Sequence, residues 1–222
     1  MGKKLIFVML LAVLVLGGFW VYKVLFLDNG IKNLSDLPSC DFYRVDNPAV
    51  VDMINTACDL ESQVGDDDEA RLKYLNAALA WKSAADALPV EQRADLNRRA
   101  VDVYRFYEQK FDDHAYSLRW NIAHLYQDLG DYNLAEEYYL KAIESNNINA
   151  EPYIALYYLY DKGNIEKNTA EIDQYFADAL KLVSENRDQL LHQYLTFLEK
   201  NNLTDKAAEV RAELKVRYPE LY

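Results

Sequence analysis

The chain has 222 residues, of which 51% are hydrophobic and 27% are charged, which is enough for one sizeable core. Its 7 glycines and 5 prolines are too few for the many turns of a β-sandwich and favour long helices. The net charge of −12 repels phosphate backbones and anionic headgroups, which argues against nucleic-acid binding. The acidic surface serves either solubility or a basic partner.

The first apolar segment of the chain spans residues 5–27, and Lys23 is the one charged residue in it. About 20 apolar residues are enough for a helix to cross a bilayer, so we predict a transmembrane anchor here. Trp20 and Tyr22 lie near one end of this segment, where aromatic belts occur, and the lysine beside them can reach the interface.

The orientation of the anchor follows from the charges that flank it. Lys3 and Lys4, in residues 1–4, predict a cytoplasmic N-terminus. The expected product is a single-pass protein of the inner or cytoplasmic membrane with a periplasmic or other extracytoplasmic domain. A cleaved signal peptide with its cleavage site at Val15–Gly17 is the alternative, although the apolar run continues to Phe26. The domain is exported in both cases.

Residues 28–65 are predicted to form a membrane-proximal linker followed by a first helix over Pro48–Gln63. The two cysteines of the chain, Cys40 and Cys58, lie in this segment. In an exported domain such a pair predicts a disulfide, which would contribute roughly 3 kcal/mol by closing the loop. Two unpaired thiols are the alternative. We predict no metal site, because no histidine or further cysteine lies nearby to complete four ligands.

Residues 66–113 are predicted to form a helical hairpin. The acidic run Asp66–Glu69 lacks the central glycine of a calcium loop and instead precedes a helix, whose positive end it favours. We expect helices over Glu69–Ala87 and Glu91–Phe111. Apolar side chains recur in the second helix at three- and four-residue spacing, which is typical of packing on one side, at Leu96, Ala100, Val103, Tyr104, Tyr107 and Phe111.

Residues 116–149 carry small and aromatic residues at the spacing of a 34-residue unit, at Tyr126, Gly130, Tyr132, Ala135, Tyr139 and Ala142. This pattern resembles the tetratricopeptide repeat (TPR) family. The resemblance implies a pair of antiparallel helices in which Ala135 permits close approach and Gly130 permits the turn between them.

Two looser units follow, so the repeats are expected to span residues 116–222. In residues 188–221, Asn201 and Asn202 stand in for the turn glycine. Residues 150–187 carry about three extra residues around Asn164–Thr169, which should bulge. We therefore predict an all-α protein, in which an N-terminal transmembrane helix precedes an α-solenoid of TPR-like antiparallel helix pairs. The hairpin of residues 66–113 would be a divergent member of the stack.

In the TPR family the first helix of each repeat lines a concave groove. The resemblance implies that a groove of this kind binds a protein partner through Trp120, His124, Gln127, Glu151, Ile154, Tyr158, Asp161, His192 and Thr196. This aromatic and acidic set suits a peptide or helix with apolar anchors and basic residues. Packing of Trp120 against the preceding hairpin, at Val103–Phe111, is the alternative.

The sequence carries no motif that points to an enzyme, such as a metal-binding histidine pair, a phosphate-binding glycine loop or a nucleophile elbow. We expect no catalytic residues and no cofactor. The expected function is that of a membrane-anchored scaffold or adaptor, which binds a protein partner in an extracytoplasmic envelope complex or serves as a subunit of a larger membrane assembly. The alternative is a chaperone-like holder of exported or translocon-emerging polypeptides.

Overall fold

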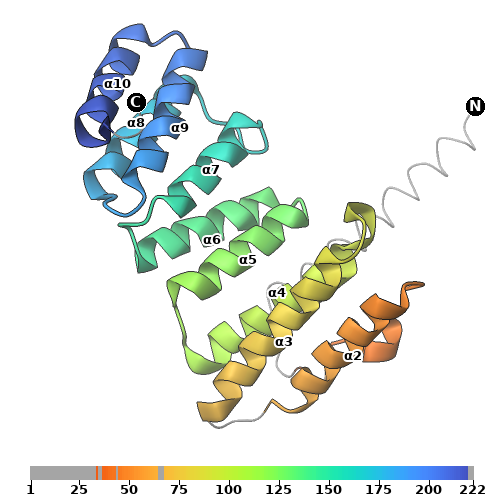
Figure 1. Cartoon of the computed structure of the whole chain (residues 1–222). Helices are drawn as coiled ribbons and strands as arrows, with labels where there is room; N and C mark the ends of the chain where they lie inside the picture. The colour runs from red at the N-terminus through yellow and green to blue at the C-terminus, as the bar shows by residue number, and fades with distance from the viewer. Residues whose placement is uncertain (1–33, 35–36, 44, 65–67, 220–222) are drawn as a thin grey trace, which may run out of the picture.

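The computed structural model describes residues 34, 37–43, 45–64 and 68–219, whose arrangement Figure 1 shows. These residues form nine α-helices and two short 3₁₀ helices, and they contain no β-strand beyond one isolated bridge. The predicted cytoplasmic residues 1–4 and the predicted anchor, residues 5–27, lie outside the described residues. Within the described ranges, no helix combines the length and the apolar character that crossing a bilayer requires.

The helices follow one another as a stack of hairpins. Their bounds are α2 Pro48–Ser62, α3 Asp68–Asp86, α4 Ala94–Phe111, α5 Tyr116–Asp128, α6 Tyr132–Ser145, α7 Glu151–Asp161, α8 Thr169–Leu182, α9 Arg187–Lys200 and α10 Thr204–Arg217. Helix α2 packs on α3, and four pairs follow, α3 with α4, α5 with α6, α7 with α8 and α9 with α10. Each pair also contacts the next, so the described chain forms a helical solenoid from α2 to α10 (Figure 1).

The first two helices were predicted within one residue at each end. Helix α2 begins where the sequence supplies both common start signals. The Asn47 side chain accepts a hydrogen bond from the Ala49 N–H at 3.1 Å, and Pro48 occupies the first turn. The small side chains Ala77, Ala78, Ala84 and Ala85 of α3 are fully buried, which lets its neighbours approach closely.

The predicted start of the next helix, at Glu91, was wrong, because α4 begins at Ala94. Residues 90–92 instead form a separate 3₁₀ turn, in which the Gln92 N–H donates to the Pro89 carbonyl at 2.9 Å. Because this turn precedes the helix, α4 begins three residues later than predicted.

A buried ion pair joins α2 to α4. Arg99 is 4% exposed, and its guanidinium binds both carboxylate oxygens of Glu61, which is 9% exposed. The Trp81 Nε1–H of α3 donates to the same carboxylate at 2.9 Å. Arg99 Nη1 also donates to the Pro38 carbonyl at 3.2 Å. Three helices and the segment before them therefore meet at this ion pair. The hydrogen bonds offset the cost of burying the Glu61 carboxylate.

The segment before α2, residues 37–43, forms a strap along the first helices. Its Cys40 is joined to Cys58 of α2 by a disulfide, as predicted. Leu37 is buried, and the Tyr43 ring lies 4.9 Å from the Trp81 ring. A covalent bond, an apolar contact and a ring contact thus hold the strap, in addition to the Arg99 hydrogen bond.

The repeats from α5 onward show the expected hairpin geometry. Gly130 has a φ of +77° in the turn between α5 and α6, a conformation that favours glycine. Asn202 takes the corresponding turn between α9 and α10 with a φ of +57°, as its position in the sequence predicted. Ala135 and Tyr139 of α6 are fully buried in the first hairpin.

The middle hairpin departs from its neighbours where the extra residues were found. Residues 162–168 connect α7 to α8, and these two helices approach less closely than α5 and α6. Lys167 of this connection contacts the preceding hairpin, with its Nζ 3.8 Å from Glu136 of α6, and it lies 5.5 Å from the centre of the Tyr160 ring of α7. The insertion is therefore accommodated at the end of the hairpin, and the stack continues.

Candidate protein-binding face

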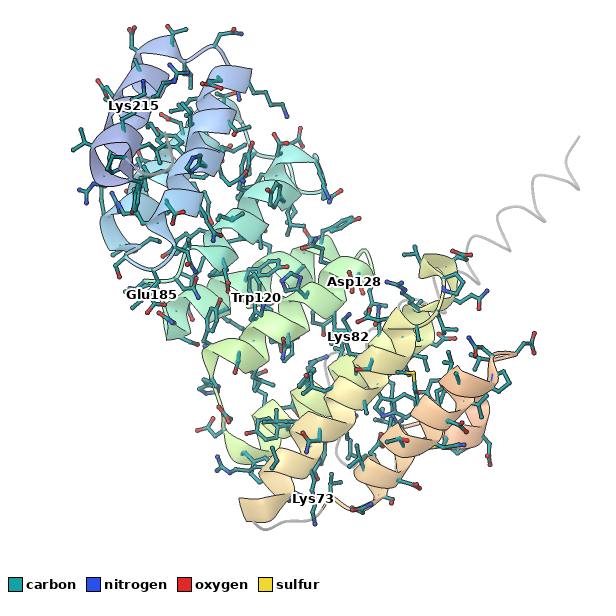
Figure 2. All side chains as sticks on the ribbon, in the orientation of Figure 1. Lys73, Lys82, Trp120, Asp128, Glu185 and Lys215 are labelled. Atoms are coloured by element: carbon teal, nitrogen blue, oxygen red, sulfur yellow. A yellow bond between two sulfur atoms is a disulfide. The ribbon has the colours of Figure 1, made fainter. Side chains whose placement is uncertain are left out.

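The first helices of successive pairs, α3, α5, α7 and α9, share one face of the stack, which we call the first-helix face. Side chains link each of these helices to the next, through Lys82 Nζ and Asp128 at 3.9 Å, the Tyr116 hydroxyl and Glu151 at 3.1 Å, and Lys200 Nζ and Asp161 at 2.6 Å. Figure 2 shows Lys82 and Asp128 close to one another, and Trp120 farther along the same side. The face is therefore continuous from α3 to α9.

Helix α5 contributes an aromatic run in which the side chains are four residues apart. The Tyr116 and Trp120 rings are stacked, with their centres 6.1 Å apart and their planes at 17°. His124 meets the Trp120 ring edge-on at 4.2 Å, and the buried Tyr139 of α6 lies 5.4 Å from the same ring. The aromatic neighbours of Trp120 thus come from its own hairpin and not from Val103–Phe111.

Two predicted groove residues of α5, Gln127 and His124, interact with other parts of the protein. Gln127 accepts a hydrogen bond from the Tyr139 hydroxyl at 2.7 Å, so it helps to hold α5 on α6. Burial lowers the pKa of the His124 imidazole; the Lys82 charge lowers it further, and the Asp128 charge opposes this. His124 is therefore neutral at neutral pH.

The four predicted groove residues on helix α7 differ in their exposure and in their contacts. Glu151 is exposed, and its carboxylate accepts the Tyr116 hydrogen bond. Ile154 is partly buried, whereas Tyr158 is 41% exposed, the largest apolar surface that α7 offers. Asp161 is paired with Lys200 and so carries less uncompensated charge than its position in the sequence suggested.

Helix α9 places the last predicted residues at the far end of the face. The His192 Nδ1 lies 2.7 Å from the Asp188 carbonyl, and the Thr196 hydroxyl donates to the His192 carbonyl at 2.9 Å. These side chains interact with their own helix. Their contribution to partner binding stays a prediction.

The face is hollowed between α3 and α5, and none of the predicted groove residues lies on α3. The hollow has a volume of about 430 Å³ and is lined by Leu79, Lys82, Asp86, Arg93, Tyr104, Asn121, His124, Leu125 and Asp128. Of the predicted groove residues, only His124 lines it. Three of the lining residues, Leu79, Lys82 and Asp86, lie on α3 at positions i, i+3 and i+7, away from the buried alanines of that helix. This spacing is the sequence signal that the prediction missed.

Charge at the hollow is balanced within the protein. Lys82 Nζ lies 2.6 Å from Asp86 on its own helix as well as 3.9 Å from Asp128. Arg93 Nη1 lies 3.8 Å from the same Asp86, and its Nε donates to the Leu88 carbonyl at 2.7 Å. The exposed apolar side chain there is Leu79, at 47%. The charges that line the hollow are therefore paired with one another, and Leu79 adds an apolar side chain beside them.

The described part of the chain contains no group of three or more histidine, cysteine, aspartate or glutamate side chains placed to hold a metal ion. Residues 116–149 match the family model for the tetratricopeptide repeat. No curated protein matches the chain. Repeats of this kind typically bind proteins and do not catalyse reactions. The match covers one hairpin, α5 with α6, and the helical stack on either side of it is similar in architecture to tetratricopeptide repeats.

Proposed function

We propose that the chain is a membrane-anchored scaffold that binds a protein partner on the first-helix face. Residues 5–27 anchor it, the N-terminus is cytoplasmic, and the helical domain holds its partner outside the cytoplasm in an envelope complex. The observation that carries this proposal is the continuous face of four first helices, which exposes aromatic and apolar side chains between acidic ones.

The composition of the face supports binding of a peptide or helix. Tyr158 and the partly exposed Trp120 are residue types that dominate the energetics of protein interfaces. Leu79 adds an exposed apolar side chain beside the hollow. Exposed apolar groups with a polar surround are typical of a binding surface.

The test is recovery of the partner by the full chain, extracted in detergent from the membranes of the cells that make it. The double variant Trp120→Ala with Tyr158→Ala removes the two aromatic side chains from the face. We expect partner recovery to fall by about tenfold or more, since truncating interface aromatics costs at least about 2 kcal/mol. The measurement is quantitative mass spectrometry after crosslinking in intact membranes.

The matched control is Leu140→Ala with Leu182→Ala, which removes two exposed apolar side chains (44% and 49%) from the second helices α6 and α8. It should leave recovery unchanged. Equal recovery with both double variants, at unchanged helical circular dichroism, would contradict the proposal. One partner in fixed stoichiometry fits a scaffold, whereas suppressed aggregation of several unrelated unfolded proteins would favour a chaperone-like holder.

The anchor and the orientation are tested separately. The chain should stay with the membrane fraction after alkaline carbonate extraction. Protease added from outside to cells with a permeabilised outer layer should cleave the helical domain. Release by carbonate, or protection of the domain until the cytoplasmic membrane is lysed, would contradict this part of the proposal.

A further inference from the structure

The Tyr116 hydroxyl of α5 forms hydrogen bonds with a residue of α7 and with a residue of the connection before α7. It donates to Glu151 of α7 at 3.1 Å and accepts from Asn149 Nδ2 at 3.3 Å. Asn149 in turn forms the isolated parallel bridge with Glu185, in the connection between α8 and α9. The chain fold therefore brings two glutamates of distant segments, Glu151 and Glu185, near the start of α5. Figure 2 labels Glu185 and Trp120 on this part of the molecule.

These two carboxylates differ from the other acids of the face. Within the described residues, the ion pairs include Asp128, Asp161 and Glu199, but neither Glu151 nor Glu185. Both glutamates are exposed. Their negative charge is therefore not compensated by a cation of the described chain.

The nearest arginine along α5 is directed elsewhere. Arg119 Nη1 donates to the Lys141 carbonyl at 3.0 Å and to Ser145 Oγ at 2.8 Å, and its Nε lies 3.4 Å from Glu108. The guanidinium is thereby bound between α4 and α6. It does not neutralise the two glutamates.

The aromatic run beside the glutamates is also free of positive charge. Tyr116 and Trp120 are stacked and partly exposed, and His124 at the end of the run is neutral at neutral pH because burial lowers its pKa. Burial, then the charge of Glu151 and then that of Glu185, raises the pKa of the Tyr116 hydroxyl. Both carboxylates therefore act on the Tyr116 hydroxyl.

We propose that Tyr116, Trp120, Glu151 and Glu185 form a site for an arginine side chain of the partner. A guanidinium can stack on aromatic rings and donate paired hydrogen bonds to carboxylates, which a compact ammonium cannot do equally well. The proposal rests on the proposed function and deepens it, since it names a side chain that the partner must supply. Tyr158, two turns after Glu151 on α7, lies where an apolar neighbour of that arginine would bind.

The test uses a small probe that does not require the partner. The full chain in detergent micelles is labelled with 5-fluorotryptophan, and the Trp120 resonance is assigned with Trp120→Phe. N-acetyl-arginine methylamide is titrated at constant ionic strength, with the citrulline analogue as its uncharged isostere. We expect a saturable shift of the Trp120 resonance with the arginine probe alone. The resonance of the fully buried Trp81 should not move.

The double variant Glu151→Gln with Glu185→Gln should weaken probe binding by about tenfold, because it removes both charges from the site. Glu166→Gln, at an exposed position in the connection between α7 and α8, should leave probe binding unchanged. An equal shift with the citrulline probe, or equal arginine affinity of the double variant and the wild type, would overturn the assignment.

The two proposals fail in different ways. Suppose that the wild type binds the arginine probe as expected, while the Trp120 and Tyr158 double variant recovers the partner in full. This outcome would refute the scaffold face and leave the arginine-binding site in place. Loss of recovery in that variant without specific binding of the arginine probe would refute the site and leave the scaffold face in place.

Discussion

The first part of the described chain, from the strap to α4, and the repeats from α5 to α10 are both built of helical hairpins. Both have aromatic contacts, as between Tyr74 and Phe111 in the first part, but the first part has further links of other kinds. The first part has a disulfide and a buried ion pair between Glu61 and Arg99. The repeats have aromatic packing, as around the fully buried Phe176, whose ring centre lies 4.9 Å from that of Tyr194 and 5.0 Å from that of Tyr157.

This difference suggests a division of roles within the proposed scaffold. The buried ion pair and the disulfide hold the strap on α2, α3 and α4, because burial of the Glu61 carboxylate is costly unless Arg99 and Trp81 bind it. The apolar contacts of the repeats are distributed over many residues, so each hairpin depends mainly on its neighbours. The end next to the predicted anchor should thus be rigid, and its stability should depend strongly on a few individual contacts.

The largest effect is expected from Arg99→Met. It leaves the Glu61 carboxylate buried without its cation, which should lower the free energy of unfolding by about 3–5 kcal/mol. Denaturant unfolding of the full chain in detergent, followed by circular dichroism, measures the loss. Arg98→Met on the same helix is the control, since Arg98 pairs at 3.4 Å with the exposed Asp95 at the surface and should cost under about 1 kcal/mol.

A second variant separates charge burial from lost packing. Replacing both partners, Glu61→Gln with Arg99→Met, removes the unpaired charge, so it should recover part of the stability that Arg99→Met loses. If the double variant is no more stable than the single one, the ion pair is not the reason for the loss.

The next largest effect is expected from breaking the disulfide with Cys40→Ser and Cys58→Ser. The cysteines are 18 residues apart, and opening a loop of this size should cost about 3 kcal/mol. Amide hydrogen exchange should rise in residues 37–62 and stay unchanged in α5 and α6, because the repeats do not depend on the strap. Faster exchange throughout the chain would contradict the division into two differently held regions.

The sequence predicted the turns of the repeats, and in the region before them it predicted α2, α3 and the disulfide but not the buried ion pair. Gly130, Ala135 and Asn202 carry out local tasks, a turn or a close approach, that a fixed period makes visible. The ion pair of Glu61 and Arg99 joins residues 38 positions apart, and no spacing rule distinguishes them from surface charges.

The candidate face was anticipated only in part for a related reason. The family frame placed Trp120 and Tyr158 on the first helices, where the structure has them. The frame did not extend to α3, so the hollow beside Leu79 was missed. Nor could it show that Glu185 lies by Tyr116, because the bridge to Asn149 that brings it there is a backbone contact between two loops.

A smaller effect is expected at the turn of the first repeat. No atom lies within 4 Å of a Cβ added at Gly130, so Gly130→Ala should cost only the strain of a left-handed backbone, about 1 kcal/mol. Gly130→Asn should cost less, since the chain itself uses asparagine in this conformation at Asn202. Thermal unfolding of the two variants compares them, and an equal loss in both would show that the backbone conformation is not what the turn requires.

The last effect has the opposite sign, since it is a gain in stability, and it is expected on α4, the helix that packs on the first repeat. Asp102 of α4 lies one turn from Arg99 on one side and one turn from Arg105 on the other. Burial raises the pKa of the Asp102 carboxyl from 3.8 to about 6, against the lowering effect of the neighbouring arginines Arg105, Arg99 and Arg98. The folded chain therefore holds this proton more tightly than the unfolded chain does.

It follows that the Asp102 carboxyl favours the folded state at low pH and that this contribution is lost as the pH rises from about 4 to about 6. Asp102→Asn resembles the protonated carboxyl at every pH and should not show this loss. The variant should match the wild type near pH 4 and be more stable than the wild type above pH 6.5, by up to about 3 kcal/mol for a pKa difference of about two units. Asp95→Asn removes the same charge from an exposed position of α4 and is the control. Parallel melting profiles for the two variants between pH 4 and pH 7.5 would show that burial on α4 does not set the proton affinity of Asp102, and that the boundary between the two regions is no more sensitive to charge than the surface.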